Sequence, residues 1–80
     1  MTGQTQECVR AEALFVSDVQ RSDPVTPDEV RAIVRRTVRR YGPVTLAAIV
    51  AQEYGEHPDT AVRRMSWALG TIREAYPAAA

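Results

Sequence analysis

The sequence predicts an all-α protein, a compact bundle of about four helices. Eighty residues are enough for one domain. Apolar residues recur at helical spacing in successive segments, and proline or glycine interrupts the chain between them. The breaks are short and carry no hairpin signal, which favours helices packed on helices. We expect the domain to span residues 9–76, with flexible ends at 1–8 and 77–80.

The first segment, "VRAEALFVSDVQ" at residues 9–20, is dense in apolar residues but ambiguous in period. A helical stripe is formed by Val9, Ala13, Val16 and Val19. Because Leu14 and Phe15 widen this stripe, we interpret the segment as a helix buried on more than one side, with a short strand as the alternative. The two prolines of "RSDPVTP" end it.

The second helix has the clearest start signal. In "TPDE", Thr26 is a good N-cap, Pro27 suits the first helical position and Glu29 completes a capping box. A helical stripe then runs to the stop at Gly42-Pro43, and it consists of Val30, Ile33, Val34, Thr37, Val38 and Tyr41. The opposite half of this helix is covered by arginines at positions 31, 35, 36, 39 and 40.

Two further helices complete the bundle. We expect the third to be capped by Thr45 and to stop at Gly55, and its core residues are Leu46, Ile49, Val50 and Tyr54. The last should have Pro58 in its first turn and run until Pro77. Its predicted core stripe is Val62, Met65, Leu69 and Ile72.

Composition and charge limit the function. The formal net charge is zero, but residues 1–30 carry −4 and residues 31–80 carry +4, so either one half binds anions or the two halves attract each other. His57 and Cys8 are each the only residue of their type, which leaves a catalytic triad, a histidine-rich metal site or a cysteine zinc site unsupported. We therefore expect no enzyme, metal or cofactor. The sequence has no membrane span or signal peptide, so the expected location is cytoplasmic.

Residues 47–69 carry a small residue, Ala51, followed four positions later by Gly55 and then by "DTAVRRM" with Thr60 and Val62. This segment resembles the helix-turn-helix of small bacterial DNA-binding regulators. The resemblance implies a helix pair within residues 45–76 and double-stranded DNA as a partner, in a role associated with transcription.

At about 100° per residue, four residues share one face of the last helix, and they are Thr60, Arg63, Arg64 and Trp67. If the resemblance holds, this face enters the major groove, where arginine recognises guanine. The arginines of the second helix are then the candidate phosphate contacts, namely Arg35, Arg36, Arg39 and Arg40.

Two alternatives remain open for Trp67. Tryptophan and arginine are enriched at interface hot spots, so the face with Arg63 and Arg64 is also a candidate surface for a protein partner or a homodimer. Alternatively, Trp67 belongs to the core and is covered by "ALFV" of the first segment.

Overall fold

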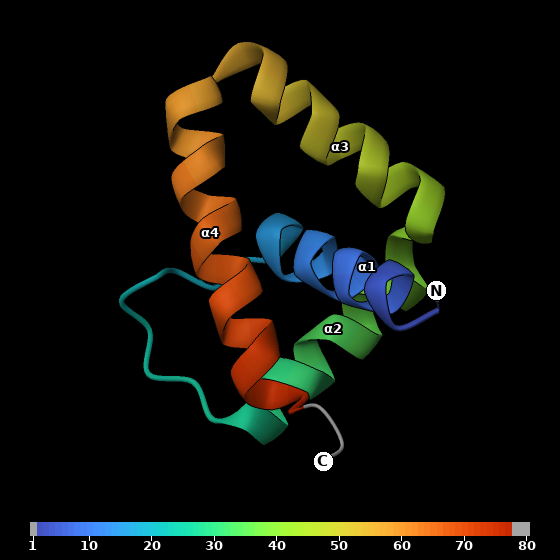
Figure 1. Ribbon diagram of the computed structural model, residues 1–80, viewed down its shortest axis with the longest axis vertical. Helices are drawn as coiled ribbons and strands as arrows, with labels where there is room; N and C mark the ends of the chain where they lie inside the picture. The colour runs from blue at the N-terminus through green and yellow to red at the C-terminus, as the bar shows by residue number, and fades with distance from the viewer. Residues whose placement is uncertain (1, 78–80) are drawn as a thin grey trace.

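The computed structural model describes the backbone of residues 2–77 and the side chains of residues 6–77. Over this range it contains four helices and no strand. The helices are α1 (Thr2–Val16), α2 (Pro27–Tyr41), α3 (Pro43–Glu56) and α4 (Pro58–Ala75). Figure 1 shows α1 in the middle of the bundle, with α4 on one side, α3 above and α2 behind. The predicted all-α bundle is confirmed.

Helix α1 is the central helix because its apolar side chains lie on several sides. Ala11, Ala13, Leu14 and Phe15 are all buried, and a helix that is apolar around most of its circumference is normally enclosed by other elements. The other three helices each pack against it. The helix interpretation of this segment is therefore correct, and the strand alternative is wrong.

The bounds of α1 differ from those expected. The helix begins at Thr2 rather than near Val9, so positions 2–8, expected as a flexible end, are helical. It stops at Val16, before Gln20, because the Ser17 hydroxyl donates to the Leu14 carbonyl at 2.6 Å and competes with the helical pattern. The remaining expected flexible positions, Met1 and 78–80, lie outside the described residues.

The start of α2 has the predicted capping box. The backbone N–H of Glu29 donates to Thr26 Oγ1 at 3.1 Å, and the Thr26 N–H donates to Glu29 Oε1 at 2.8 Å. Arg31 ties α2 to the end of α4, since its Nη1 donates to the Ala75 carbonyl at 2.6 Å. The same guanidinium also pairs with Asp28.

The boundaries of α3 correct two expectations. Gly42 ends α2 with φ +78° and immediately precedes the first residue of α3, Pro43. Thr45 is therefore inside α3 and is not its cap. Gly55 does not stop the helix, which continues to Glu56, and only His57 separates α3 from α4. Pro58 begins α4, as predicted.

The buried face of α4 is rotated from the predicted stripe. Its buried residues are Ala61, Ala68, Ile72 and Ala75, whereas Val62 is 56% exposed and Met65 and Leu69 are half-buried. Two alanines of α4, Ala68 and Ala75, belong to the same core cluster as Ala11 and Ala13 of α1, and Ala61 belongs to a second cluster with Phe15. Small side chains allow two helices to approach closely. The buried positions of α4 are therefore occupied mainly by alanines and not by the larger Val62, Met65 and Leu69.

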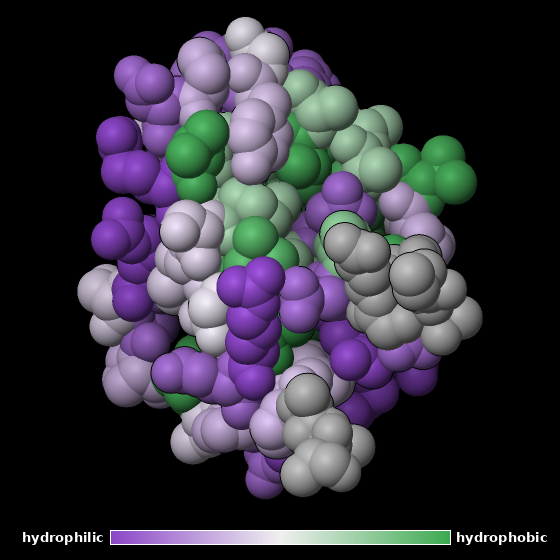
Figure 2. Space-filling model, in the orientation of Figure 1, coloured by the Kyte–Doolittle hydropathy of each residue, from purple (hydrophilic) through white to green (hydrophobic). Residues whose placement is uncertain are grey.

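The outer surfaces of α3 and α4 differ in polarity. Figure 2 shows apolar surface over α3, at the upper right, and hydrophilic surface along the outer edge of α4. Val44 of α3 is 84% exposed, and three alanines of the same helix are exposed beside it, namely Ala47, Ala48 and Ala51. Within the described residues, no helix has the length and apolar character needed to cross a bilayer.

Candidate functional site

Arg64 of α4 caps the C-terminal end of α1. Its Nε donates to the Phe15 carbonyl at 2.7 Å, and its Nη2 lies within hydrogen-bonding distance of three further carbonyls at 3.0 to 3.4 Å, those of Leu14, Ser17 and Val19. The last carbonyls of a helix have no partner within the helix and carry the negative end of its dipole. A guanidinium, with five N–H donors, satisfies several of them at once.

The positive charge of Arg64 is stabilised by these carbonyl dipoles and not by an acidic side chain of any described residue. Among the described residues, no carboxylate lies within ion-pair distance of it. Burial lowers the pKa of the Arg64 guanidinium from its ordinary value, because removal from water disfavours the charged form. Arginine nevertheless stays protonated in proteins. Arg64 is therefore a fixed, half-buried cation without an acidic partner.

Trp67 is half-buried and lies beside Arg64. The indole packs against the main core cluster, and the Arg64 guanidinium carbon lies 5.0 Å from the centre of its ring, a cation–π distance. The same carbon is 5.8 Å from the centre of the Phe15 ring. Trp67 thus packs on the core and remains partly exposed, which agrees in part with the core alternative, and its role at an interface stays a prediction.

The four candidate residues of α4 line one open hollow together with the chain that follows α1. Its volume is about 760 Å³. We call it the Arg64 hollow, and its lining is Gln20, Arg21, Ser22, Thr60, Arg63, Arg64 and Trp67. The lining has three arginines and no acidic residue. Sequence reasoning missed the first three of these residues, because periodicity does not give the path of an irregular segment.

Two of the four α4 candidates are fully at the surface. Thr60 and Arg63 are exposed, whereas Arg64 and Trp67 are half-buried. The expected single outward face is therefore divided, because Arg64 bonds to the end of α1 and Trp67 packs against the core. The outermost residues of α4 also include acidic side chains, among them Asp59 and Glu74.

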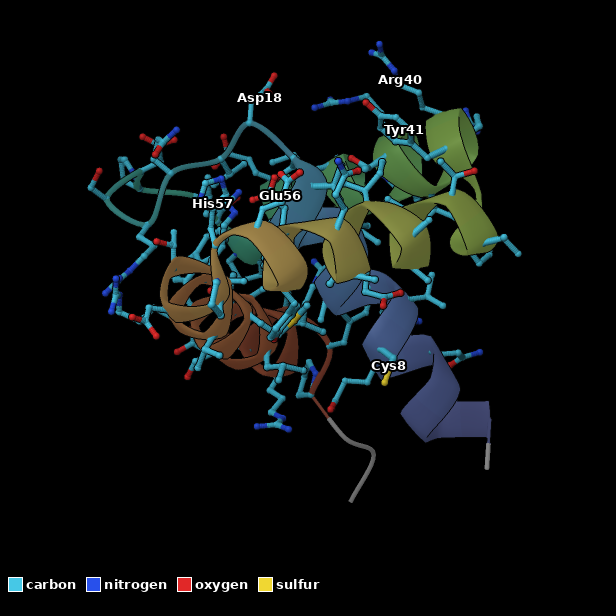
Figure 3. All side chains as sticks on the ribbon, turned by 90° about the horizontal axis from the view of Figure 1, so that it is seen from above. Cys8, Asp18, Arg40, Tyr41, Glu56 and His57 are labelled. Atoms are coloured by element: carbon cyan, nitrogen blue, oxygen red, sulfur yellow. The ribbon has the colours of Figure 1, made fainter. Side chains whose placement is uncertain are left out.

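The strongest exposed concentration of positive charge lies on α2. Its four candidate arginines, which we call the α2 arginines, are all exposed, and they are Arg35, Arg36, Arg39 and Arg40. None forms an ion pair with a described residue. Figure 3 shows the Arg40 side chain extending away from the body of the protein, near Tyr41. Its guanidinium carbon lies 5.4 Å from the centre of the Tyr41 ring.

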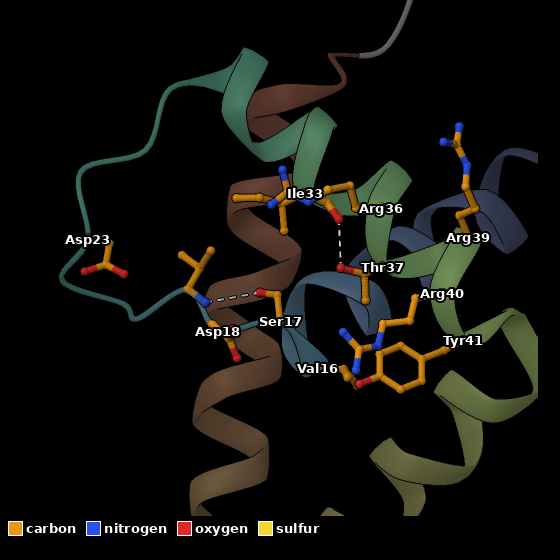
Figure 4. Close-up of a pocket in the computed structure, with 11 residues that line it drawn as sticks. Val16, Ser17, Asp18, Asp23, Ile33, Arg36, Thr37, Arg39, Arg40 and Tyr41 are labelled. Carbon is orange, nitrogen blue, oxygen red and sulfur yellow. Dashed lines mark hydrogen bonds between the residues drawn. The ribbon is translucent and has the colours of Figure 1, made fainter.

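Three of the α2 arginines line a second hollow, between α2 and the segment after α1 (Figure 4). Its volume is about 820 Å³. Unlike the Arg64 hollow, it also contains two carboxylates, Asp18 and Asp23. The Thr37 hydroxyl within it already donates to the Ile33 carbonyl at 2.7 Å. Nearby acidic groups therefore reduce the positive potential of this hollow.

The remaining reactive side chains are dispersed. His57, at the α3–α4 junction, and Cys8, on α1, are both exposed and far apart in Figure 3. Within the described part of the chain, no three His, Cys, Asp or Glu residues form a group that could hold a metal ion. Comparison of the chain with protein-family models, curated proteins and solved structures finds no match to any of them.

Proposed function

We propose that the protein binds double-stranded DNA and that the α2 arginines supply most of the affinity by contacting phosphates. The observation that carries this proposal is the set of four exposed arginines on one half of one helix, without an ion-pair partner among the described residues. Exposed arginines without an ion-pair partner can contact phosphate oxygens, and each contact releases counterions from the DNA.

The N-terminal part of α4 is the proposed base-reading element. Thr60 and Arg63 are exposed there, and an exposed arginine can donate two hydrogen bonds to a guanine edge. Arg64 has a supporting role in this proposal, because its Nε and Nη2 are bonded to carbonyls at the end of α1. The helix pair α3–α4 corresponds to the segment that resembles a helix-turn-helix, which favours a role in transcription.

The alternative is a protein-binding surface made by Trp67 with Arg63 and Arg64. It has less support, because Trp67 packs against the core and its ring is already stacked by Arg64. An anchor residue at an interface needs a face that is free to enter a pocket on the partner.

The test is the affinity for a duplex as a function of salt concentration. Four phosphate contacts at about −0.9 each predict a slope of about −3.6 for the logarithm of the binding constant against the logarithm of salt concentration. Fluorescence anisotropy of a labelled duplex measures this slope. If no duplex binds at low salt, the proposal is wrong.

A further inference from the structure

The lining of the Arg64 hollow carries an excess of positive charge. Three guanidinium groups line it without any acidic side chain in the lining. Like charges gathered at one site repel each other, and this repulsion is relieved when an anion binds between them. The second hollow, beside α2, has two aspartates opposite its arginines and lacks this imbalance.

Arg64 is held in place before any ligand arrives. Its hydrogen bonds to the carbonyls at the end of α1 fix the plane of the guanidinium. Nη1, by contrast, donates to no described residue, so its two N–H groups are free for an acceptor. A donor that is already immobilised loses little conformational entropy when it binds.

The other groups around Arg64 are suited to phosphate oxygens. Arg21 and Arg63 are exposed and form no ion pair with a described residue. Ser22 and Thr60 are exposed, and each hydroxyl can donate to an oxygen. The donors come from two separate parts of the chain, the segment after α1 and the start of α4.

We propose that the Arg64 hollow binds a phosphate monoester dianion. Its three arginines are more than the single charge of a phosphodiester requires, and a terminal phosphate presents three oxygens to donors. Guanidinium groups bind phosphate through paired N–H donors, which gives geometric selectivity. This site is separate from the α2 arginines but shares Thr60 and Arg63 with the proposed base-reading element. A phosphate titration in the absence of DNA therefore tests it apart from duplex binding.

Trp67 provides the measurement, because it is the only tryptophan and lies in the lining of the hollow. We expect inorganic phosphate, titrated against sodium chloride at matched ionic strength, to produce a saturable change in Trp67 fluorescence. Arg63→Gln and Arg21→Gln should each weaken this binding by about tenfold or more, the effect of losing one charged hydrogen-bonding partner. Both side chains are exposed, so neither change should affect folding.

Arg73→Gln is the matched control, since it removes an exposed arginine of α4 that does not line the hollow. It should leave the phosphate titration unchanged. The proposal is overturned if phosphate and chloride give the same response, or if Arg63→Gln and Arg21→Gln bind phosphate as the original protein does. Arg64 itself is not the test residue, because its substitution also removes the cap of α1.

A second comparison identifies the source of the phosphate. If the ligand is a DNA end, a 5′-phosphorylated oligonucleotide should bind more tightly than its 5′-hydroxyl counterpart, and this difference should disappear in Arg63→Gln. If the ligand is a small molecule, a sugar phosphate should bind at least as tightly as inorganic phosphate, and the two oligonucleotides should bind equally. If both comparisons show no preference for a monoester, the assignment to this ligand class is wrong.

Discussion

Arg64 Nε donates to the backbone carbonyl of Phe15 at 2.7 Å, joining residues 49 positions apart in the chain. This contact connects the start of α4 to the end of the central helix. It also explains why a charged residue sits beside Trp67, because the guanidinium lies between the indole and the last turn of α1. The arginine beside Trp67 is thus held there by its hydrogen bonds to the end of α1.

Replacing Arg64 should therefore destabilise the fold. Arg64→Met keeps an apolar stem but removes the donors to the end of α1, and we expect a loss of about 2 kcal/mol in the free energy of unfolding. Urea unfolding followed by circular dichroism measures it. Arg63→Met, the exposed neighbour, is the control and should change stability by less than about 0.5 kcal/mol. Equal effects of the two substitutions would contradict the capping role.

The rotated core face of α4 gives a second prediction. Val62→Ala should change stability by less than about 0.5 kcal/mol because Val62 is exposed. Ile72→Ala, in the same helix, should cost about 2 to 5 kcal/mol because Ile72 is buried. Thermal or urea unfolding of the two variants tests this order. A cost for Val62→Ala similar to that for Ile72→Ala would support the stripe that the sequence indicated, which contains both residues.

Substitution by alanine should have opposite effects on stability at Gly70 and at Gly42. Gly70 lies inside α4, an added Cβ would contact nothing within 4 Å, and its φ is not positive. Gly70→Ala should stabilise the protein by about 0.5 to 1 kcal/mol. Gly42, at the α2–α3 junction, has φ +78° and ψ 158°, a region open almost only to glycine, so Gly42→Ala should destabilise the protein by about 1 to 3 kcal/mol. A loss of stability in Gly70→Ala would indicate that the exterior of α4 is more constrained than the structure describes.

The capping box of α2 should make stability depend on pH. The hydrogen bond from the Thr26 backbone lowers the pKa of Glu29 below its ordinary value of 4.5. Because folding lowers this pKa, the charged carboxylate stabilises the folded state fully at pH values above the ordinary pKa of 4.5. This contribution is lost as the pH falls through the folded-state pKa. The original protein should thus be more stable than Glu29→Gln at neutral pH.

This difference between the original protein and Glu29→Gln should disappear in acid. The comparison with the variant is needed because other carboxyl groups also titrate, and burial raises the pKa of Glu12, which changes stability in the opposite direction. Urea unfolding of both proteins at neutral pH and at a pH below the folded-state pKa of Glu29 gives the four free energies of unfolding to be compared. A difference that is equal at both pH values would exclude the charged capping interaction.

Local signals in the sequence were sufficient for much of the fold. The Thr26–Glu29 capping box, the stop at Gly42 and the start at Pro58 each depend on adjacent residues, and all three occur in the structure. The start of α1 was missed because its first residues are polar and lack a period. The core of α4 was misplaced because close packing with α1 favours alanine, which carries a weak hydrophobic signal.

The candidate site was only partly accessible to sequence reasoning. Helical spacing correctly brought Thr60 and Arg63 to one side of α4, next to Arg64 and Trp67. It could not reveal that Arg64 bonds to the carbonyl of Phe15, since that contact depends on how two helices dock. For the same reason, the place of Arg21 in the Arg64 hollow appears only in three dimensions.

The central claim is that the α2 arginines bind DNA phosphates, and substitution of all four tests it most directly. The variant with Arg35, Arg36, Arg39 and Arg40 replaced by glutamine should lose duplex binding at low salt while keeping its helical circular dichroism. The matched variant with four lysines keeps the charge, so it should retain binding and a steep dependence on salt. If the glutamine variant binds the duplex as tightly as the original protein at the same salt concentration, the α2 arginines do not bind DNA.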